Sequence, residues 1–201
     1  MKRKVSYPAV IITAFLAFAV MSQGCGIFDP DDEPPKEEPL PPLPPDSPQA
    51  VIDNMEHAYK NFDYERYLPL IRDDFVFIFN EDDIEKFPDD IPPEGWWGAP
   101  EELLSAEHML DRNYEPSDPI YKIDSMTLLV QLSGDLLPSN QQGAPEGTLE
   151  SYVTFDLTVA ANQGQLDLLV KSRPLFFFAP DDSTEKVWRL WKIQDAPFQE
   201  D

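Results

Sequence analysis

The stretch from Asp29 to Pro48 most limits what this chain can fold into, because it consists almost entirely of Pro, Asp and Glu. Such a composition buries too little apolar surface to form a core, and its negative charges repel one another. Pro-rich segments favour the extended polyproline II conformation. We therefore predict a semi-rigid linker over residues 25–47 and one folded domain over residues 48–201. Two alternatives stay open, namely padding of no particular length and a proline-recognition motif in "PLPPLPP".

The segment before this linker has the features of an export signal. Basic residues at positions 2–4 precede an apolar run, Ala9–Met21, and small residues follow that run. The run is shorter than the roughly 20 residues that a membrane-spanning helix needs. A basic start, a short apolar stretch and small residues near its end are typical of a signal peptide. We predict a lipoprotein signal peptide over residues 1–24.

The sequence "SQGC" ends this segment, and its Cys25 is the single cysteine of the chain. Small residues followed by Cys resemble the lipobox of bacterial lipoproteins, although Ser22 and Gln23 differ from the usual residues. The resemblance implies that Cys25 is lipidated and becomes the first mature residue, and two or more acyl chains would anchor it stably. Gly26 in place of Asp points, by analogy, to the outer membrane. The alternative is an ordinary cleaved signal that leaves a free thiol.

The charge of the chain excludes one class of partner. The formal net charge is −23, with 38 acidic and 15 basic residues. Nucleic-acid binding needs a basic surface for the phosphates, so we expect none. Insertion of the folded part among anionic headgroups is disfavoured for the same reason. We expect the lipid to make the membrane contact, and the domain to meet a small apolar ligand or an envelope protein.

Helices are predicted in the first half of the domain. Ser47 is a good N-cap for an amphipathic helix that presents an apolar face from Val51 to Phe62, with His57 on the solvent side. Asp63 starts a second short helix that should end or bend at Pro69. A covered strand is expected over residues 75–79, then an irregular acidic segment over residues 80–98, and a third helix over residues 99–112.

Strands are predicted in the second half, over residues 120–133, 148–162, 165–179 and 186–194. In the second of these, Val153, Phe155, Leu157 and Val159 alternate with more polar residues, as in an antiparallel strand with one buried face. Early helices and late strands predict an α+β fold. We expect a cone-like domain with three N-terminal helices packed on a curved, mostly antiparallel sheet.

Three stretches resemble the nuclear-transport-factor-2-like superfamily, which includes SnoaL-like polyketide cyclases and ketosteroid isomerases. They are "SPQAVIDNMEHAYKNFDYERYLPLIRDDFVFIF", "WWGAPEELLSAEHMLD" and "VWRLWKIQD". The resemblance implies a cone with a pocket between its helices and its concave sheet, and a possible homodimer formed through that sheet. Pro69 and the long acidic segment 80–98 depart from the family pattern.

The chain has no catalytic signature. It lacks the nucleophile elbow, the nucleotide-binding loops, H-E-x-x-H and C-x-x-C, and its two histidines are far apart, so we expect no cofactor and no metal. Enzymes of the resembled family use a pocket carboxylate or histidine as general base. The candidates for that role in this chain are Asp156, His108, Tyr59 and Tyr67. We expect Asp156 to face outward.

Aromatic residues give the remaining candidates. Trp96 and Trp97 are predicted in a loop at the mouth of the pocket, where they could close over an apolar ligand or anchor a protein. The candidate pocket residues are Tyr59, Tyr67, Trp96, Trp97 and His108. Two functions follow: a lipid-anchored cone domain that binds without catalysis, or an exported isomerase, dehydratase or cyclase with a general base.

Overall fold

The structure, a computed structural model, describes residues 44–88, 91–117, 122–181 and 184–195. All of them belong to one compact unit, Pro42–Asp201. The predicted signal peptide, Cys25 and residues 25–43 of the predicted linker lie outside the described residues. Within the described part, no helix has the length and apolar character needed to cross a membrane.

The first two helices follow from local rules. Helix α1, Pro48–Asn61, begins where the Ser47 hydroxyl accepts a hydrogen bond from the Ala50 N–H, and it ends at Phe62 in a left-handed conformation. Asp63 starts the four-residue helix α2, Tyr64–Tyr67. The chain then tightens into a 3-10 turn, η2, Leu68–Leu70, because Pro69 cannot continue an α-helix. The predicted start of the first helix and the break at Pro69 are confirmed.

Eight strands form one curved sheet in the order β2-β1-β8-β7-β5-β3, while β4 and β6 also pair with β5. Strands β1 and β8 are parallel, and the other strand pairs of the described residues are antiparallel, so the predicted mostly antiparallel sheet is confirmed. The strands are β1 Ile71–Ile78, β2 Trp96–Gly98, β3 Ile123–Leu132, β4 Leu137–Pro138, β5 Leu149–Ala161, β6 Leu166–Ser172, β7 Leu175–Asp181 and β8 Thr184–Gln194.

Three of the predicted boundaries were wrong. Strand β1 begins at Ile71 rather than at residue 75. The strand expected over residues 165–179 is two strands, β6 and β7, which pair with different halves of β5. The break falls at Arg173 and Pro174, because proline has no N–H for the ladder; its carbonyl still accepts from the Val153 N–H at 2.9 Å. The segment 80–98 is not irregular throughout, since it contains helix α3, Glu81–Lys86, and strand β2.

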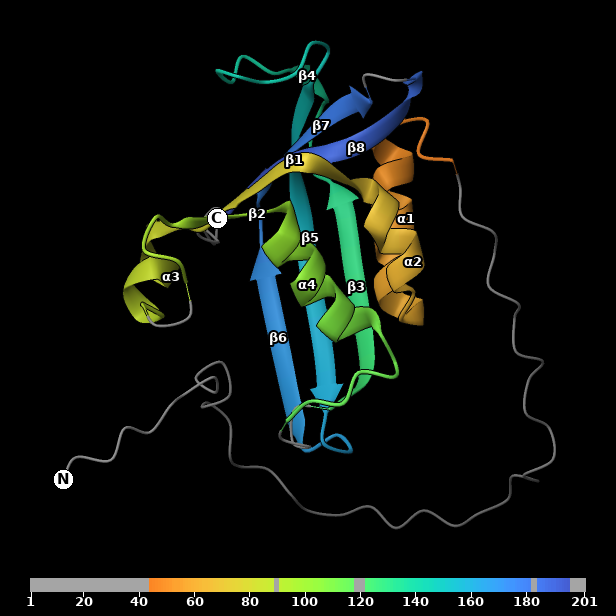
Figure 1. Ribbon diagram of the computed structural model, residues 1–201, viewed down its shortest axis with the longest axis vertical. Coiled ribbons are helices and arrows are strands. Elements are labelled where there is room, and N and C mark those ends of the chain that lie inside the picture. The colour runs from red at the N-terminus through yellow and green to blue at the C-terminus, as the bar shows by residue number, and fades with distance from the viewer. Residues whose placement is uncertain (1–43, 89–90, 118–121, 182–183, 196–201) are drawn as a thin grey trace. The chain divides into compact units, whose positions relative to one another are not determined.

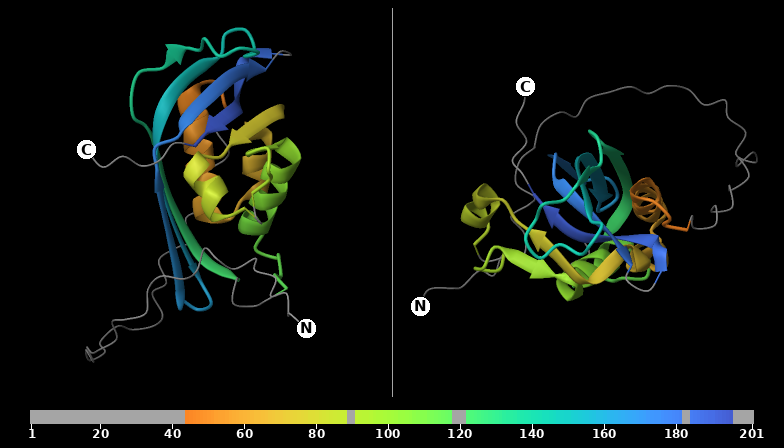
Figure 2. Two further views of the ribbon diagram at one scale, coloured as in Figure 1. Left: turned by 90° about the vertical axis from the view of Figure 1, so that its left-hand side faces the viewer. Right: turned by 90° about the horizontal axis from the view of Figure 1, so that it is seen from above.

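The core lies between the sheet and the helices that cover one of its faces. Helices α1, α2 and α4, Ala99–Leu110, lie on the same side of the curved sheet, whereas α3 stands apart from them (Figures 1 and 2). Val51 and Met55 of α1 meet Leu128 of β3, Leu157 of β5 and Phe178 of β7 in one buried cluster. The predicted α+β cone is therefore confirmed, with a short fourth helix added to it.

Candidate functional site

A buried carboxyl group lies where three helices and the edge of the sheet meet. The Tyr67 hydroxyl donates a hydrogen bond to Oε1 of Glu102 over 2.5 Å. Tyr67 is 1% exposed and Glu102 is 8% exposed, so water has little access to either group. A charged group this deeply buried is costly unless it is hydrogen-bonded, which makes this pair the most unusual polar feature of the described core.

Helical periodicity explains how Glu102 comes to be buried. In α4 the buried residues are Ala99, Glu102, Ala106 and Leu110, which recur every three to four positions and so share one face. Glu101 points elsewhere, and its Oε2 accepts a hydrogen bond from the Gly98 N–H at 3.0 Å. Only one of the two adjacent acids therefore caps the helix, while the other enters the interior.

Two tyrosines line this interior beside Glu102. The rings of Tyr59 and Tyr67 meet edge to face, with centroids 5.8 Å apart. Tyr59 comes from α1 and Tyr67 from α2, so the cluster ties both helices to α4. The two hydroxyl groups also interact with each other. The cluster Tyr59–Tyr67–Glu102 is thus a connected polar network inside an apolar core.

Burial controls the protonation of this network. It raises the pKa of Glu102, and the hydrogen bond from Tyr67 and the nearby indole of Trp97 act in the opposite direction. Burial, followed by the negative charge of Glu102, raises the pKa of both Tyr59 and Tyr67. The Trp97 Nε1 is buried and makes no hydrogen bond of normal geometry within the described part of the chain. Its effect on Glu102 is therefore that of a nearby dipole.

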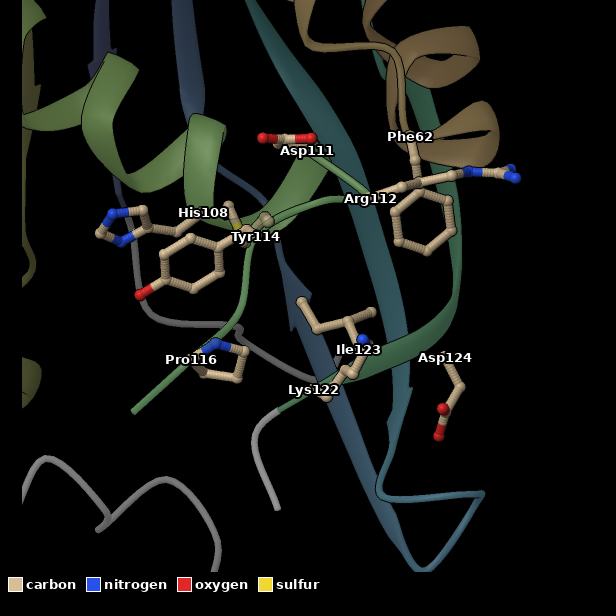
Figure 3. A pocket seen from close by; sticks show the side chains of 10 residues that line it. Phe62, His108, Asp111, Arg112, Tyr114, Pro116, Lys122, Ile123 and Asp124 are labelled. Atoms are coloured by element: carbon tan, nitrogen blue, oxygen red, sulfur yellow. The ribbon is translucent and has the colours of Figure 1, made fainter. Parts of the chain in front are cut away.

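A separate pocket opens at the other end of α4. It has a volume of about 330 Å³, within the size range of small-molecule sites. Its walls come from the end of α1, the end of α4, the following loop and the start of β3 (Figure 3). The lining residues are Phe62, His108, Met109, Asp111, Arg112, Tyr114, Pro116, Lys122, Ile123 and Asp124.

Two ring contacts shape the walls of this pocket. His108 and Tyr114 stack nearly parallel, with ring centroids 4.2 Å apart. On the other wall, the Arg112 guanidinium lies over the Phe62 ring at 5.1 Å from its centroid. Figure 3 shows Ile123 between these two walls. The pocket therefore combines these rings and Ile123 with charged side chains, namely Asp111, Arg112, Lys122 and Asp124.

The charged groups at the rim already have protein partners. The Lys122 Nζ pairs with Oε1 of Glu115 at 2.7 Å. Asp111 Oδ1 accepts a hydrogen bond from the Asn113 N–H at 2.8 Å, and Asp124 Oδ2 accepts one from the Gly164 N–H at 3.2 Å. Arg112 also donates to the Asn61 carbonyl at 3.4 Å, so each of these four charged groups makes at least one polar contact.

No protein-family model matches the sequence, and no curated protein matches it either. Among solved structures, a conserved protein from Planctomyces limnophilus is 14% identical, with a TM-score of 0.50 over 75% of this chain and 94% of that one. A nuclear transport factor 2-like superfamily protein from Salmonella enterica is 12% identical (TM-score 0.46, 75% and 87% covered). A Δ5-3-ketosteroid isomerase from Mycobacterium is 15% identical (TM-score 0.43, 78% and 95% covered).

The curved, mostly antiparallel sheet with helices on one face is the α+β cone that the resemblance implied. At identities this low the similarity concerns fold alone, and it assigns neither an activity nor a ligand to this chain. The family resemblance in the sequence is confirmed at that level.

The nuclear-transport-factor-2-like domain separates the residues that the sequence grouped as one site. Tyr59 and Tyr67 lie in the buried network, whereas His108 is exposed and lines the open pocket. Trp96 and Trp97 were expected in a loop but form strand β2, where their side chains alternate. Trp96 is 47% exposed, while Trp97 packs against Phe77 with centroids 5.6 Å apart. Neither tryptophan is among the residues that line the pocket.

The structure also shows where Asp156 and His57 lie. Asp156 lies on the face of β5 opposite Leu157 of the core, as the alternation predicted. His57 was expected to be solvated but is half-buried, and its Nε2 has no hydrogen-bond partner among the described residues. Burial, followed by the charge of Arg66, lowers its pKa. In the described residues, no three His, Cys, Asp or Glu side chains gather as a metal site would require.

Glu102 was missed because an acid in the first turn of a helix is normally explained by the helix dipole. The signal that would have found it is the spacing of Glu102, Ala106 and Leu110, which repeats at four-residue intervals on the face that the sequence assigned to the core. Leu103, the residue next to Glu102, is only partly buried.

Proposed function

We propose that this chain is a lipid-anchored protein of the bacterial cell envelope whose nuclear-transport-factor-2-like domain binds a small ligand without converting it. The observation that carries the proposal is the open pocket between Phe62 and Tyr114, which has the size of a ligand site. The lipid anchor is supported by the residues before Cys25 and by the Pro-rich linker after it. The linker would hold the domain away from the membrane surface.

The separation of the acid network from the pocket favours binding over catalysis. A general base must come within hydrogen-bonding reach of the proton that it removes. Glu102 is not among the residues that line the pocket, and its carboxylate is already engaged by Tyr67. His108, which does line it, is stacked on Tyr114 rather than paired with a carboxylate in a hydrogen bond. Glu102 and His108 therefore form no acid–base pair in the pocket, and the two carboxylates that line it, Asp111 and Asp124, accept backbone hydrogen bonds.

Native mass spectrometry tests ligand binding directly. The unit Pro42–Asp201, which holds the whole core cluster, is purified gently from cells that express it in the envelope. We expect an added mass that leaves on denaturation. Ile123→Trp, which fills the pocket, should abolish that mass, whereas Leu169→Trp at a 59% exposed position should keep it. An added mass that survives Ile123→Trp would contradict the proposed site.

Labelling of the full chain tests the anchor. Cells grown with an alkyne-tagged fatty acid should incorporate the tag into the wild-type protein and lose it in Cys25→Ser. The tag should also co-fractionate with the outer membrane. Equal labelling of both chains, or an unlabelled wild type found free in the periplasm, would refute lipidation at Cys25. Light scattering of the purified unit would at the same time test the possible homodimer.

A second candidate, an exported isomerase, dehydratase or cyclase, is favoured by one observation. Glu102 is a buried carboxyl group beside aromatic rings with a raised pKa, as general bases often are. The ligand found by mass spectrometry can be incubated with the protein in D₂O. Proton abstraction would add deuterium to that ligand, and Glu102→Gln would prevent it. We expect the ligand to gain no deuterium with either protein; deuterium in the ligand that depends on Glu102 would establish the enzyme instead.

A further inference from the structure

Strand β6 has one edge that no other strand of the described residues covers. It pairs along its length with β5 and with no further described strand. Figures 1 and 2 show no described helix or strand along its far side. The backbone N–H and C=O groups of such an edge are a template for another strand. We infer that the free edge of β6 pairs with the same edge of a second copy of this chain. The inference does not depend on the proposed function.

The side chains of β6 alternate between the core and the solvent, as the two-residue period of a strand requires. Leu168 and Val170 pack against the core cluster, whereas Asp167, Leu169 and Lys171 are exposed. Leu169, at the middle of the seven-residue strand, is 59% exposed. A second strand along the edge would cover part of this leucine and would extend both layers of side chains.

The charges on this edge are self-complementary. When two copies of β6 run antiparallel about a twofold axis at Leu169, Asp167 lies opposite the partner subunit's Lys171, and Lys171 lies opposite the partner subunit's Asp167. The twofold axis makes both pairs from one patch, as in an isologous dimer. All seven residues of the strand are paired in this register. On the inner face, Leu168 lies opposite the partner's Val170.

Other registers lose this match. Among the antiparallel registers of residues 166–172, only the one centred on Leu169 sets Asp167 opposite Lys171. Registers centred on Asp167 or on Lys171 bring like charges together, and a shift by one residue exchanges the two faces. Within the chain, Asp156 of β5 already lies opposite Lys171, so the dimer would continue a row of alternating charges. Exposed ion pairs add little affinity, but they fix the register.

This contact differs from the homodimer that the family resemblance implied, because it uses the edge of a strand rather than the face of the sheet. A single pair of strands is a small interface, so we expect a dimer that forms only at raised protein concentration. The net charge of −23 also makes two chains repel each other. The dimer should therefore be measured at about 0.15 M salt, where charges more than about 8 Å apart are largely screened.

Charge reversal tests the register. Sedimentation velocity of the purified Pro42–Asp201 unit measures monomer and dimer over a range of protein concentrations. Asp167→Lys and Lys171→Asp should each weaken the dimer at least about tenfold, because each sets like charges opposite each other twice. Combining both substitutions should restore the dimer to within about threefold of the wild-type affinity, since opposite charges face each other again. Far-UV circular dichroism and thermal melting check that each variant is folded.

Cysteine variants locate the contact. The unit Pro42–Asp201 contains no cysteine, because Cys25 is the single one of the chain. In Leu169→Cys the two new thiols would lie directly opposite each other, so a short bis-maleimide should join two chains. Leu129→Cys is the matched control and should stay unlinked. Leu129 is a 40% exposed leucine on the same face of the sheet, but it lies on β3, beyond β5.

Three results would overturn the inference. The first is a unit that stays monomeric at its highest soluble concentration. The second is a dimer that keeps its affinity in both single reversals, or one that is not restored when they are combined. The third is cross-linking through Leu129→Cys and not through Leu169→Cys, which would place the contact on the face of the sheet away from β6.

Discussion

Replacing Glu102 with Gln should change how the stability of the domain depends on pH. In the folded state burial raises the pKa of Glu102, whereas in the unfolded chain this carboxyl titrates near its ordinary value of 4.5. Between those two pKa values the folded protein holds a proton that the unfolded chain has released. The contribution of Glu102 to stability is therefore fully present below pH 4.5 and is lost as the pH rises through the folded-state pKa.

The size of the effect follows from linkage. One proton held only by the folded state lowers the free energy of unfolding by about 1.4 kcal/mol for each pH unit within that window. Gln has the shape of Glu and cannot titrate, and its carbonyl can still accept the hydrogen bond from Tyr67. The difference in stability between Glu102→Gln and wild type should therefore rise with pH in favour of the variant. It should become constant above the folded-state pKa.

Tyr67→Phe provides an independent check on the same carboxyl group. The substitution removes the Tyr67 hydroxyl, whose hydrogen bond lowers the pKa of Glu102. The pH range over which the folded protein alone holds the Glu102 proton should therefore extend upward. The buried carboxyl also loses its donor, which should cost about 1–3 kcal/mol at neutral pH. At a pH above the folded-state pKa of Glu102, the same Tyr67→Phe change should cost less in Glu102→Gln, because the amide carries no charge there and the carboxylate does.

Urea unfolding followed by far-UV circular dichroism at intervals between about pH 4 and pH 8 measures these free energies. The surface acids titrate alike in all variants, so differences between curves isolate Glu102. Parallel stability curves for wild type and Glu102→Gln would refute the reasoning, because they would mean that Glu102 titrates alike in the folded and unfolded states.

Three further predictions concern the fold, each measured by urea unfolding. Leu128→Ala, at a 1% exposed core position, should cost about 2–5 kcal/mol, whereas Leu169→Ala at a 59% exposed position should cost under about 0.5 kcal/mol; equal costs would contradict the assigned faces of the sheet. Ser47→Ala should cost about 1 kcal/mol through the lost N-cap and Ser47→Asp should not, so a loss in both would point to another cause. Gly95→Ala should cost about 1 kcal/mol, because Gly95 has a φ of +75° and a new Cβ would lie 2.8 Å from the Ile84 Cδ1. Combining Ile84→Ala with Gly95→Ala should remove the close contact between residues 84 and 95 but not the backbone strain at residue 95. Full recovery of the lost stability would therefore show that this strain is negligible.

Much of the fold could be predicted because the signals are local. Ser47 followed by Pro48 marks the start of a helix by its own hydrogen bond and fixed backbone angle. Pro69 ends α2 for a reason contained in one residue. The alternation along β5 follows from the two-residue period of a strand, so its buried face could be assigned before its neighbours were known.

Strand β2 could not be predicted from the residues next to it in the sequence. Trp96 and Trp97 follow a segment rich in Pro and acids, which is typical of a loop, and three residues are too few to show a period. They form a strand because β1 supplies the partners, with Trp97 opposite Phe77 and Trp96 opposite Ile78. A contact between residues some 20 positions apart is a tertiary property, and no window of sequence around the tryptophans contains it.

From its own residues, the sequence determined that the main helices precede most of the strands, the α+β class and the acidic character that makes nucleic-acid binding unexpected. The tertiary structure alone decided that Glu102 is buried against Tyr67 while Glu101 caps the helix, and that the pocket forms between Phe62 and Tyr114. The physical reason is that propensity and capping depend on near neighbours in sequence. Burial, a shifted pKa and a pocket wall depend on which distant segments come to lie around a side chain.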